Sequence, residues 1–380
     1  MKNILVIHQS AELYGSDKML LLLLKSMDKA NFYPVVVLPG EGPLKQELEK
    51  ENIKVVTAPV LKVYRKMFTP KNLYRFFKDI KKGVNLLDKL NGEYRFDLIY
   101  SNTLAVLLGM FYARKRKIKH VWHVHEIIAH PKIFAEAYPR LLNKTAHKVI
   151  CNSFATRDNL LQRVPALQSK TVVVYNGLDE SQRVSNVAAK ADFGFTQEDI
   201  VITLVGRISR LKGHKWTVSA FAKYLKTSNA KLFFVGSPVP GQEYYETELR
   251  DIIKYEGLEN KVTILPFTKN LKQIWDVTDI ALMPSTEAES FGLVGLEAML
   301  AKKPLIASNL GGLKEIVLNN ETGYLVDPLD DKALADALIK LMDNPQLRKE
   351  FGESGYNRAK QQFSLQNYLN GINSVLEAES

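Results

Sequence analysis

Short apolar runs rich in β-branched residues alternate with helical patterns along nearly the whole chain. The expected strands of the first half are residues 3–7, 34–38, 54–58, 97–101, 120–124, 148–152 and 171–175. Those of the second half are residues 199–206, 230–236, 261–267, 279–285 and 303–309, and a turn is expected at 321–328. Strands that alternate with helices pair in parallel. The sequence therefore predicts the α/β class, with two Rossmann-like parallel-sheet domains.

A polar stretch with few apolar residues separates the two sets of strands, at residues 178–198. Domain boundaries fall in such segments, so we expect an N-terminal domain over 1–180 and a C-terminal domain over 181–362. Each is long enough to bury its own core. Ligands bind at the carboxyl ends of the strands in sheets of this kind, and we expect those ends to face each other across a cleft.

Composition excludes several classes of protein. The chain has one cysteine, Cys151, and seven scattered histidines. An internal disulfide is thereby excluded and no ligand spacing indicates a metal site, so we predict metal-independent chemistry without a bound cofactor. No apolar run approaches the roughly 18–20 residues that cross a bilayer. The first residues, MKNILVIH, enter a strand and lack the features of a signal peptide, which predicts a cytoplasmic protein.

The net charge of +11 is concentrated in the N-terminal half. Residues 1–180 hold about 29 Lys and Arg against 16 Asp and Glu, whereas the rest of the chain is nearly balanced. Basic and aromatic residues mix in 62–82, and 114–120 is almost continuously basic. Such segments suit an anionic membrane interface, so we predict peripheral contact with the inner face of the cytoplasmic membrane. A solvated basic face is the alternative, and a nucleic-acid partner is disfavoured because no recognition module is present.

The segment ESFGLVGLE, residues 289–297, places two carboxylates around the start of an apolar helix. Gly292 lets the backbone approach a ligand, and the N–H groups at a helix start attract phosphate. Glu289 and Glu297 would then accept hydrogen bonds from hydroxyls at the two ends of the ligand, as a nucleotide sugar supplies. The alternative is a helix-entry charge followed by a solvated helical residue.

A second segment, VITLVGRISRLKG at 201–213, is an apolar run followed by a glycine turn and two cations. Arg207 offers a fork of donors for phosphate oxygens, and Lys212 offers a mobile point charge. Both could reach one diphosphate. Cations aimed at the leaving oxygen stabilise the charge that develops when a sugar–phosphate bond breaks. As surface charges the two residues would be unremarkable.

The motifs GRISRLKG and ESFGLVGLEAM, together with LYGSD at 13–17 and WHVHE at 122–126, resemble the retaining family-4 glycosyltransferases of the GT-B fold. The resemblance extends along nearly the whole chain, in the expected order. It implies sugar transfer from a nucleoside-diphosphate sugar to a hydroxyl of a lipid-linked or polysaccharide acceptor, as in cell-envelope polysaccharide biosynthesis. It also implies that a C-terminal helix at about 363–380 packs back on the N-terminal domain.

The resemblance assigns roles to residues of the second half. Glu297 would receive the ribose hydroxyls and Glu289 those of the donor sugar, and the diphosphate would lie over Phe291, Gly292, Leu293 and Val294. The base would lie against main-chain groups of Leu265 and Phe267. Main-chain recognition leaves little trace in side chains, and a UDP-sugar is only slightly favoured.

The same resemblance assigns residues of the first half. The loop at Gly15 would close over the donor phosphates. His125 would lie beside the transferred sugar, because it is nearer the carboxyl end of its strand than His123. Acceptor contacts are expected from Tyr14 and Asn102, and Glu126 would either support His125 without touching a ligand or be a further contact of the acceptor.

Alternative functions remain open on the sequence alone. A sugar-nucleotide epimerase of the same fold would bind a similar donor. A non-catalytic partner subunit would keep the fold but lose Arg207, Lys212 or Glu297, all of which are present. A nucleic-acid-binding protein would account for the basic half only. A nicotinamide dehydrogenase is disfavoured because a single glycine follows the first strand, where the dinucleotide fingerprint would need three.

Overall fold

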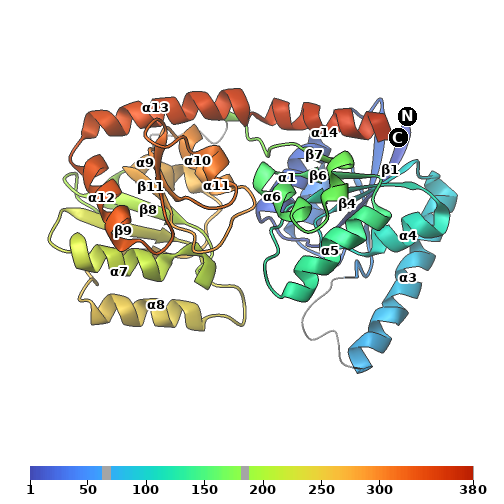
Figure 1. Cartoon of the computed structure of the whole chain (residues 1–380), viewed down its shortest axis with the longest axis horizontal. Coiled ribbons are helices and arrows are strands. Elements are labelled where there is room, and N and C mark those ends of the chain that lie inside the picture. Colours follow the sequence, from blue (N-terminus) through green and yellow to red (C-terminus); the bar gives the residue numbers. More distant parts are fainter. Residues whose placement is uncertain (62–69, 181–187, 380) are drawn as a thin grey trace. The chain divides into compact units, whose positions relative to one another are not determined.

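The computed structural model describes residues 1–61, 70–180 and 188–379, and it divides into two compact units (Figure 1). The N-terminal unit is Met1–Gly177 together with the segment from Gln366 onward, and the C-terminal unit is Leu178–Leu365. The sequence analysis placed the boundary at 180/181 instead. Parts of the expected linker (181–187) and of the basic segment (62–69) lie outside the described residues.

The N-terminal unit contains a seven-stranded sheet in the order β3-β2-β1-β4-β5-β6-β7, with every pair parallel. Each strand coincides with an apolar run of the sequence, as predicted. The bounds are β1 Lys2–His8, β2 Phe32–Leu38, β3 Lys54–Thr57, β4 Leu98–Asn102, β5 Lys119–Val124, β6 Lys148–Cys151 and β7 Thr171–Val173.

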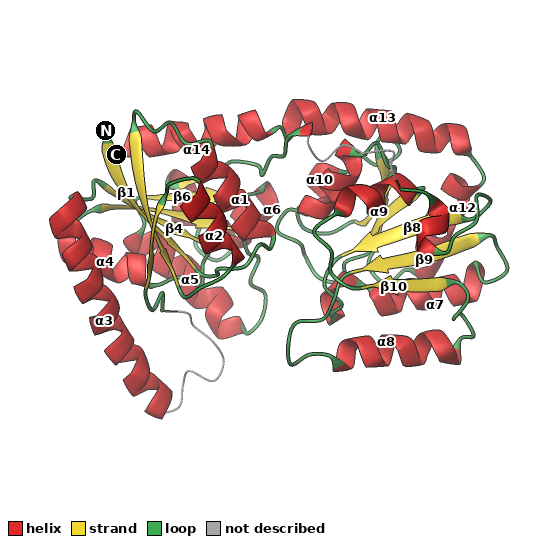
Figure 2. Cartoon of the chain, turned by 180° about the vertical axis from the view of Figure 1, so that it is seen from behind, coloured by secondary structure: helices red, strands yellow, loops and turns green. Residues whose placement is uncertain are grey.

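Helices cover both faces of this sheet (Figure 2). They are α1 Gly15–Lys25, α2 Pro43–Lys50, α3 Pro70–Tyr94, α4 Leu108–Arg116, α5 Lys132–Thr145, α6 Phe154–Leu161, the 3₁₀ helix η2 Pro165–Ser169 and α14 Leu365–Glu379. Alternate strand residues point to opposite faces. Leu5 and Ile7 of β1 pack into a core with Leu87 of α3 and Leu142 of α5, so even-numbered β1 residues such as His8 face the other side.

The C-terminal helix α14 packs on that other face. The hydroxyl of Tyr368 lies 3.5 Å from the main-chain oxygen of Met19 in α1, and its ring lies 6.4 Å from the ring of His123. Gly371 allows close approach, because a Cβ there would lie 2.7 Å from Val174. The last helix of the chain is therefore part of the N-terminal unit.

The C-terminal unit contains a six-stranded sheet in the order β10-β9-β8-β11-β12-β13, again with every pair parallel. The bounds are β8 Ile200–Val205, β9 Ala230–Val235, β10 Val262–Leu265, β11 Ile280–Met283, β12 Leu305–Ser308 and β13 Gly323–Val326. Two Rossmann-like α/β units are thus confirmed. One prediction was wrong: residues 321–328 are not only a turn, since they include the edge strand β13.

A glycine makes this edge strand possible. A Cβ on Gly323 would lie 1.9 Å from the main-chain oxygen of Leu305, so only glycine lets β13 approach β12 this closely. The turn signals that surround the strand, a Thr-Gly pair and a proline two residues beyond its end, hid a run of only four residues. Edge strands this short give a weak periodic signal.

The helices of the C-terminal unit complete its layers. They are the 3₁₀ helices η4 Lys190–Phe193 and η5 Arg210–Lys212, followed by α7 His214–Tyr224, α8 Tyr244–Tyr255, α9 Leu271–Val277, α10 Leu293–Leu300, α11 Leu313–Ile316, α12 Asp331–Met342 and α13 Pro345–Gln362. The main core joins Ile202 of β8 and Phe234 of β9 to Phe221 of α7 and Leu338 of α12. Among the helices that the structure describes, none combines the length and apolarity that a membrane span requires.

Candidate functional site

The strand order changes direction beside the first strand of each sheet. In the N-terminal unit β1 lies between β2 and β4, and in the C-terminal unit β8 lies between β9 and β11. Loops that leave neighbouring strands toward opposite faces of a parallel sheet open a crevice at the carboxyl ends of those strands, and ligands bind there. Most of the polar residues predicted from the sequence follow these strands.

In the C-terminal unit the two predicted cations lie on the loop between β8 and α7. Arg207 is exposed two residues after β8 ends, and Lys212 is partly buried at the end of η5. Gly213 follows with φ of +73°, and a Cβ there would lie 1.8 Å from the main-chain oxygen of Pro284. The conformation and the close approach both require glycine. Gly213 therefore presses the Lys212 loop against the segment that follows β11.

Hydrogen bonds join the same two loops. The Thr286 N–H donates to the Leu211 oxygen at 2.9 Å, and the Thr286 hydroxyl donates to the Arg210 oxygen at 3.0 Å. The side chain of Arg210 forms an exposed ion pair with Glu287. The position of Lys212 is thus fixed by its neighbours on both sides.

Lys212 and Glu289 form the centre of the site. Lys212 Nζ lies 2.5 Å from Glu289 Oε1, and the Ser285 hydroxyl donates to the same oxygen at 2.5 Å. Burial opposes ionisation of Glu289, but the charge and hydrogen bond of Lys212, the Ser285 hydroxyl and the charge of Arg207 hold its pKa below the ordinary value. The carboxylate is therefore ionised at neutral pH, beside two cations.

The helix α10 begins at Leu293, four residues after Glu289. Gly292 caps it with φ of +112°, and a Cβ there would lie 2.6 Å from Leu313. The first N–H groups of a helix have no partner within it, so Leu293 and Val294 provide the donors predicted for an anion. Glu297 lies one turn further along α10 and is only 4% exposed, which makes it a buried acid and not the solvated residue of the alternative interpretation.

Two further glycines shape this turn. Gly312 donates its N–H to the main-chain oxygen of Glu289 at 2.7 Å, and a Cβ on Gly311 would lie 2.4 Å from the same main-chain oxygen. Phe291 is 1% exposed and packs edge-on against Phe363, with ring centroids 5.6 Å apart. Phe291 is therefore a core residue whose backbone, and not its ring, is available to a ligand.

The residues predicted to contact the base lie at the end of β10. The main-chain oxygen of Leu265 accepts a hydrogen bond from the Gly236 N–H at 2.9 Å. The main-chain N–H of Phe267 donates to the Ser237 hydroxyl at 3.0 Å. Phe267 is 56% exposed. Two main-chain groups expected to recognise a base are thus already hydrogen-bonded within the unit.

In the N-terminal unit four buried polar side chains form a continuous chain of hydrogen bonds, which we call the relay: Asp17, His8, Asn102 and His125. Asp17 Oδ1 lies 2.6 Å from His8 Nε2, and His8 Nδ1 lies 3.0 Å from Asn102 Nδ2. Asn102 Oδ1 lies 2.9 Å from His125 Nε2. The first three side chains are at most 1% exposed and His125 is 9% exposed.

The register of the sheet places the relay. His8 ends β1 and is paired with Asn102, which ends β4, while His125 follows the end of β5. The rings of His123 and His125 lie 3.9 Å apart on one face, as alternation along the strand predicts. His123 Nδ1 is bound by the Tyr100 hydroxyl at 2.6 Å, so His123 is held within the unit.

Glu126 fixes the backbone of His125. Its Oε2 accepts the His125 N–H at 3.0 Å and the Leu104 N–H at 3.1 Å. Burial raises the pKa of the Glu126 carboxyl to about 7, although these main-chain donors oppose the rise. Its carboxyl group is therefore turned toward the chain itself.

The loop at Gly15 is tied to the relay. Gly15 begins α1 and is exposed, and Tyr14, at the N-cap, is 45% exposed. The Tyr14 N–H donates to Asp17 Oδ2 at 2.9 Å. Asp17 thus caps the helix and holds His8 at the same time.

The structure brings together some predicted residues and leaves others apart. Arg207, Lys212 and Glu289 form one cluster, and Asn102 and His125 belong to the relay. Sequence reasoning missed His8, Asp17 and Ser285 as members of these clusters. The register of β1 and β4 is the signal that could have found His8, because both strands end in a polar residue. Within the described ranges, no three His, Cys, Asp or Glu side chains are grouped so that they could hold a metal ion.

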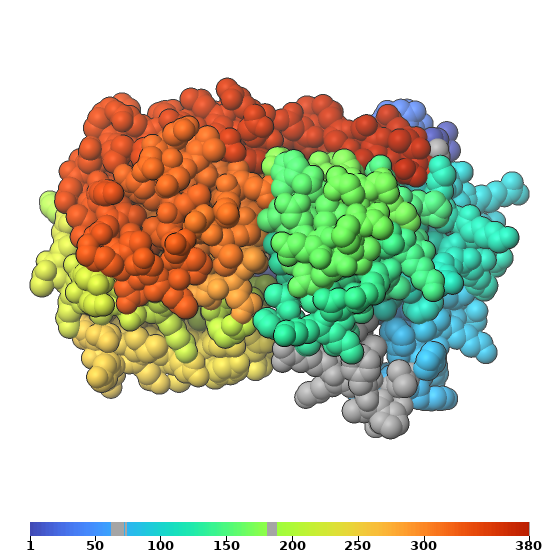
Figure 3. All heavy atoms as spheres, viewed as in Figure 1, coloured from blue at the N-terminus to red at the C-terminus, as the bar shows by residue number. Residues whose placement is uncertain are grey.

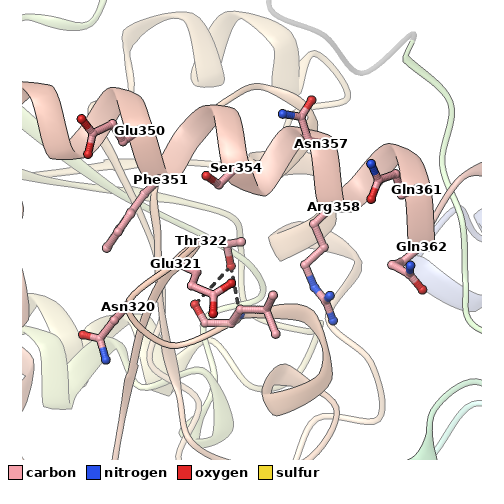
Figure 4. A pocket seen from close by; sticks show the side chains of 11 residues that line it. Asn320, Glu321, Thr322, Glu350, Phe351, Ser354, Asn357, Arg358, Gln361 and Gln362 are labelled. Carbon is pink, nitrogen blue, oxygen red and sulfur yellow. Dashed lines mark hydrogen bonds between the residues drawn. The ribbon is translucent and has the colours of Figure 1, made fainter.

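A separate pocket of about 520 Å³ opens between α13 and the loop before β13 (Figure 4). Its lining includes Asn320, Glu350 and Asn357, and none of the site residues predicted from the sequence. Arg358, which also lines it, donates to the main-chain oxygens of residues 315 and 316 at 2.6 and 2.9 Å. The candidate site is therefore assigned to the strand ends.

Comparisons with known proteins agree with this arrangement. Residues 15–182 match the family described as Glycosyltransferase Family 4, and residues 187–358 match Glycosyl transferases group 1. The N-acetyl-alpha-D-glucosaminyl L-malate synthase of Bacillus anthracis is 28% identical over 53% of this chain and 52% of its own. The D-inositol 3-phosphate glycosyltransferase of Rhodococcus jostii is 31% identical over 52% and 45%, respectively. The chain thus spans about half the length of these curated relatives.

Solved structures match over the full length. Anabaena HepE, solved in complex with UDP-glucose, is 27% identical with a TM-score of 0.85, and each chain is covered completely. The lipopolysaccharide glycosyltransferase WaaG is 14% identical over 98% of this chain and 99% of its own, with a TM-score of 0.73, and shows the fold alone. The two matched families occupy almost the whole sequence in the order predicted, and the chain belongs to the glycosyltransferases of the GT-B fold.

Proposed function

We propose that this protein is a retaining glycosyltransferase that moves a sugar from a nucleoside-diphosphate sugar to a hydroxyl of a lipid-linked or polysaccharide acceptor, without a metal ion. The observation that carries the proposal is the cluster of Arg207, Lys212 and Glu289 beside the start of α10. Two cations suit a diphosphate, and a carboxylate next to them suits the hydroxyls of an attached sugar. The complex of the relative HepE with UDP-glucose supports a nucleotide-sugar donor.

The chemistry assigned to the cluster is electrostatic. The bond between the anomeric carbon and the phosphate oxygen breaks, and the acceptor oxygen bonds to that carbon on the same face. The acceptor proton passes to the leaving phosphate oxygen, which yields the glycoside and a nucleoside diphosphate. Arg207 and Lys212 stabilise the charge that develops on the diphosphate. In this front-face route Glu289 orients the sugar and forms no covalent intermediate.

Other residues complete the donor site in this proposal. Glu297 binds the ribose, and the backbone of 291–294 lies under the diphosphate. Leu265 and Phe267 lie against the base. In the N-terminal unit, Gly15 approaches the donor phosphates and His125 the transferred sugar, while Tyr14 lines the acceptor side and Asn102 and Glu126 act through their hydrogen bonds to His125.

A panel of nucleotides tests the donor assignment. Thermal unfolding of the full chain is measured with UDP, GDP, ADP and dTDP, and a ligand that binds the folded state raises the melting temperature. We expect one diphosphate, most readily UDP, to give the largest shift. The preferred nucleotide then selects the sugar donor for a transfer assay with glycan and lipid-linked acceptors. No shift with any of the four would contradict the proposal.

The rival function, a sugar-nucleotide epimerase, predicts a different product. An epimerase changes the donor sugar in the absence of any acceptor, whereas a transferase releases the nucleoside diphosphate when an acceptor is added. Product analysis with and without acceptor separates the two. A non-catalytic subunit would bind the donor and yield neither product.

We also propose peripheral binding to an anionic membrane at the inner face of the cytoplasmic membrane, through α3. Tyr74 and Phe77 are 74% and 62% exposed, and Lys78 and Lys81 are exposed on the same side of the helix, which lies open at the surface (Figure 3). Part of the other basic segment is already neutralised, because Lys115 and Arg116 of α4 bind a carboxylate of α3 at 2.6 Å.

Vesicle sedimentation tests the membrane proposal. The full chain is expected to pellet with vesicles that contain anionic lipid, and salt should release it. Replacement of Tyr74 and Phe77 by Ser should weaken the binding without changing the net charge. Equal partition to neutral vesicles would contradict an electrostatic membrane contact.

A further inference from the structure

In each hydrogen bond of the relay, Asp17 determines which atom donates and which accepts. Its Oδ2 accepts the Tyr14 N–H at 2.9 Å and the Ser10 hydroxyl at 3.3 Å, and its Oδ1 faces His8 Nε2 at 2.6 Å. An ionised carboxylate only accepts hydrogen bonds. The proton of a neutral His8 ring is therefore on Nε2, because a carboxylate partner fixes the tautomer of the histidine that it binds.

This proton sets the orientation of Asn102. His8 Nδ1, which then carries a lone pair, lies 3.0 Å from Asn102 Nδ2 and 3.2 Å from the Asn102 main-chain oxygen. Only the amide nitrogen can donate to it. The Asn102 amide is thereby oriented with Oδ1 toward His125, where it lies 2.9 Å from Nε2. An oxygen at that place requires a proton on His125 Nε2.

We infer that Asp17, His8 and Asn102 are positioning residues that hold His125 as its Nε2–H tautomer and leave Nδ1 as a hydrogen-bond acceptor for a ligand hydroxyl. This inference rests on the proposed function, which places a sugar beside His125. No group among the described residues is seen to hydrogen-bond His125 Nδ1, and the residue is 9% exposed.

The surroundings keep His125 neutral and in place. Burial lowers its pKa well below the ordinary value, and the repulsion that a protonated His125 would meet from a protonated His123 or His8 acts in the same direction, although Asp17 opposes the shift. The ring of His123 lies 3.9 Å away and limits rotation. Glu126 holds the His125 backbone at 3.0 Å. Side chain and main chain are thus fixed separately, which suits a group that must present one atom accurately.

Asp17→Asn reverses the relay with little change of shape. The oxygen of the substituted amide can still accept the Tyr14 N–H, but the amide nitrogen then faces His8 and donates to Nε2. The His8 proton moves to Nδ1, the Asn102 amide must turn over, and His125 changes to the Nδ1–H tautomer. Ser10→Ala is the matched control, because it removes another partner of Asp17 without entering the relay.

The tautomer is read directly by ¹⁵N NMR of the histidine rings in the full chain without ligand. In the unmodified protein we expect His125 to be protonated on Nε2, and in D17N on Nδ1, while Ser10→Ala leaves the signal unchanged. A doubly protonated His8, or an Nδ1–H tautomer of His125 in the unmodified protein, would overturn the inference. This readout does not depend on transferase activity.

A double variant tests whether the tautomer of His125 follows the donor and acceptor order of the relay or only the packing of its side chains. In D17N/N102D the reversed His8 donates from Nδ1 to one carboxylate oxygen at position 102, and His125 Nε2–H donates to the other. The original tautomer of His125 is restored although two residues have changed. If D17N alone proves unstable, the unmodified protein still tests the inference, because an Nδ1–H tautomer of His125 there would overturn it.

Kinetics then link the tautomer to function. D17N should lower kcat for sugar transfer about tenfold, the effect of one hydrogen bond in the transition state, with KM for the donor within about twofold. The double variant should recover most of that loss. Equal loss in both variants would contradict a positioning role. Absence of transfer in the unmodified protein, with the expected tautomer present, would instead overturn the proposed function.

Discussion

The two units present their candidate residues at the same topological place with opposite chemistry. In the N-terminal unit the residues at the β1–β4 junction are at most 9% exposed and are joined by hydrogen bonds as the relay, which contains a single carboxylate, Asp17. In the C-terminal unit the residues at the β8–β11 junction are full charges, and the side chains of Lys212 and Glu289 are 23% and 17% exposed. The residues of the N-terminal unit are arranged to position the His125 side chain, whereas those of the C-terminal unit are arranged to hold charged groups.

Burial explains why the two differ. A charged group taken out of water is stable only when it is paired and hydrogen-bonded. Burial lowers the pKa of His120 and His123 to about 3, so these rings stay neutral and can be packed closely. Glu289 instead keeps its charge because Lys212 and Arg207 offset its desolvation. An anionic ligand therefore finds its cations in the C-terminal unit.

The strongest test of this contrast is Lys212→Ala. Loss of a preorganised cation at the leaving group should lower kcat about 100- to 1000-fold, measured as release of nucleoside diphosphate in the transfer assay. Arg210→Ala is the matched control: it lies two residues earlier in the same loop, and its side chain is 64% exposed in a surface ion pair. Such pairs contribute little, so near-normal turnover is expected. Similar losses in both variants would mean that the loop, and not the charge, matters.

Gly213→Ala should break the packing that carries Lys212. A methyl group there would lie 1.8 Å from the Pro284 oxygen at a φ of +73°, and we expect a loss of about 3 kcal/mol in the free energy of unfolding. Gly194→Ala is the matched control, since its φ is +79° but nothing lies within 4 Å. It should cost only about 1 kcal/mol. Denaturant unfolding compares the two, and equal losses would contradict the role assigned to the close approach.

Much of the fold could be predicted from the sequence, because each parallel strand is buried on both faces and appears as a short apolar run. The strand β13 was missed because its four residues lie among turn signals, and the need for Gly323 appears only once Leu305 is beside it. The local sequence pattern around β13 does not show that its backbone comes so close to that of β12. The boundary of the two units differs for a similar reason, since Leu178 pairs with Ser364 far along the chain.

The charged site was predictable and the relay was not. Arg207, Lys212 and Glu289 lie within two short motifs whose glycines and charges are visible in the sequence. The relay joins residues from two strands, one helix and the loop after β5, and it exists only because β1 and β4 pair with His8 opposite Asn102. Single residues of it, His125 and Asn102, were recognised. Their connection through His8 to Asp17 required the register of the sheet.

The smallest expected effect concerns the acid that holds the relay from the other side. The pKa of Glu126 is raised to about 7 in the folded chain, so the folded state keeps a proton that the unfolded state releases near pH 4.5. The stability that this proton provides is present below pH 4.5 and is lost as the pH rises through 7.

Glu126→Gln keeps an oxygen for the His125 and Leu104 N–H groups but cannot ionise. Its stability relative to the unmodified protein should therefore increase by about 2 kcal/mol between pH 5 and pH 8, measured by denaturant unfolding at both values. Other titrating groups cancel in this difference. Parallel pH profiles for Glu126→Gln and the unmodified protein would show that the Glu126 carboxylate is already ionised on its two main-chain donors, and the N-terminal site would then hold a second negative charge beside that of Asp17.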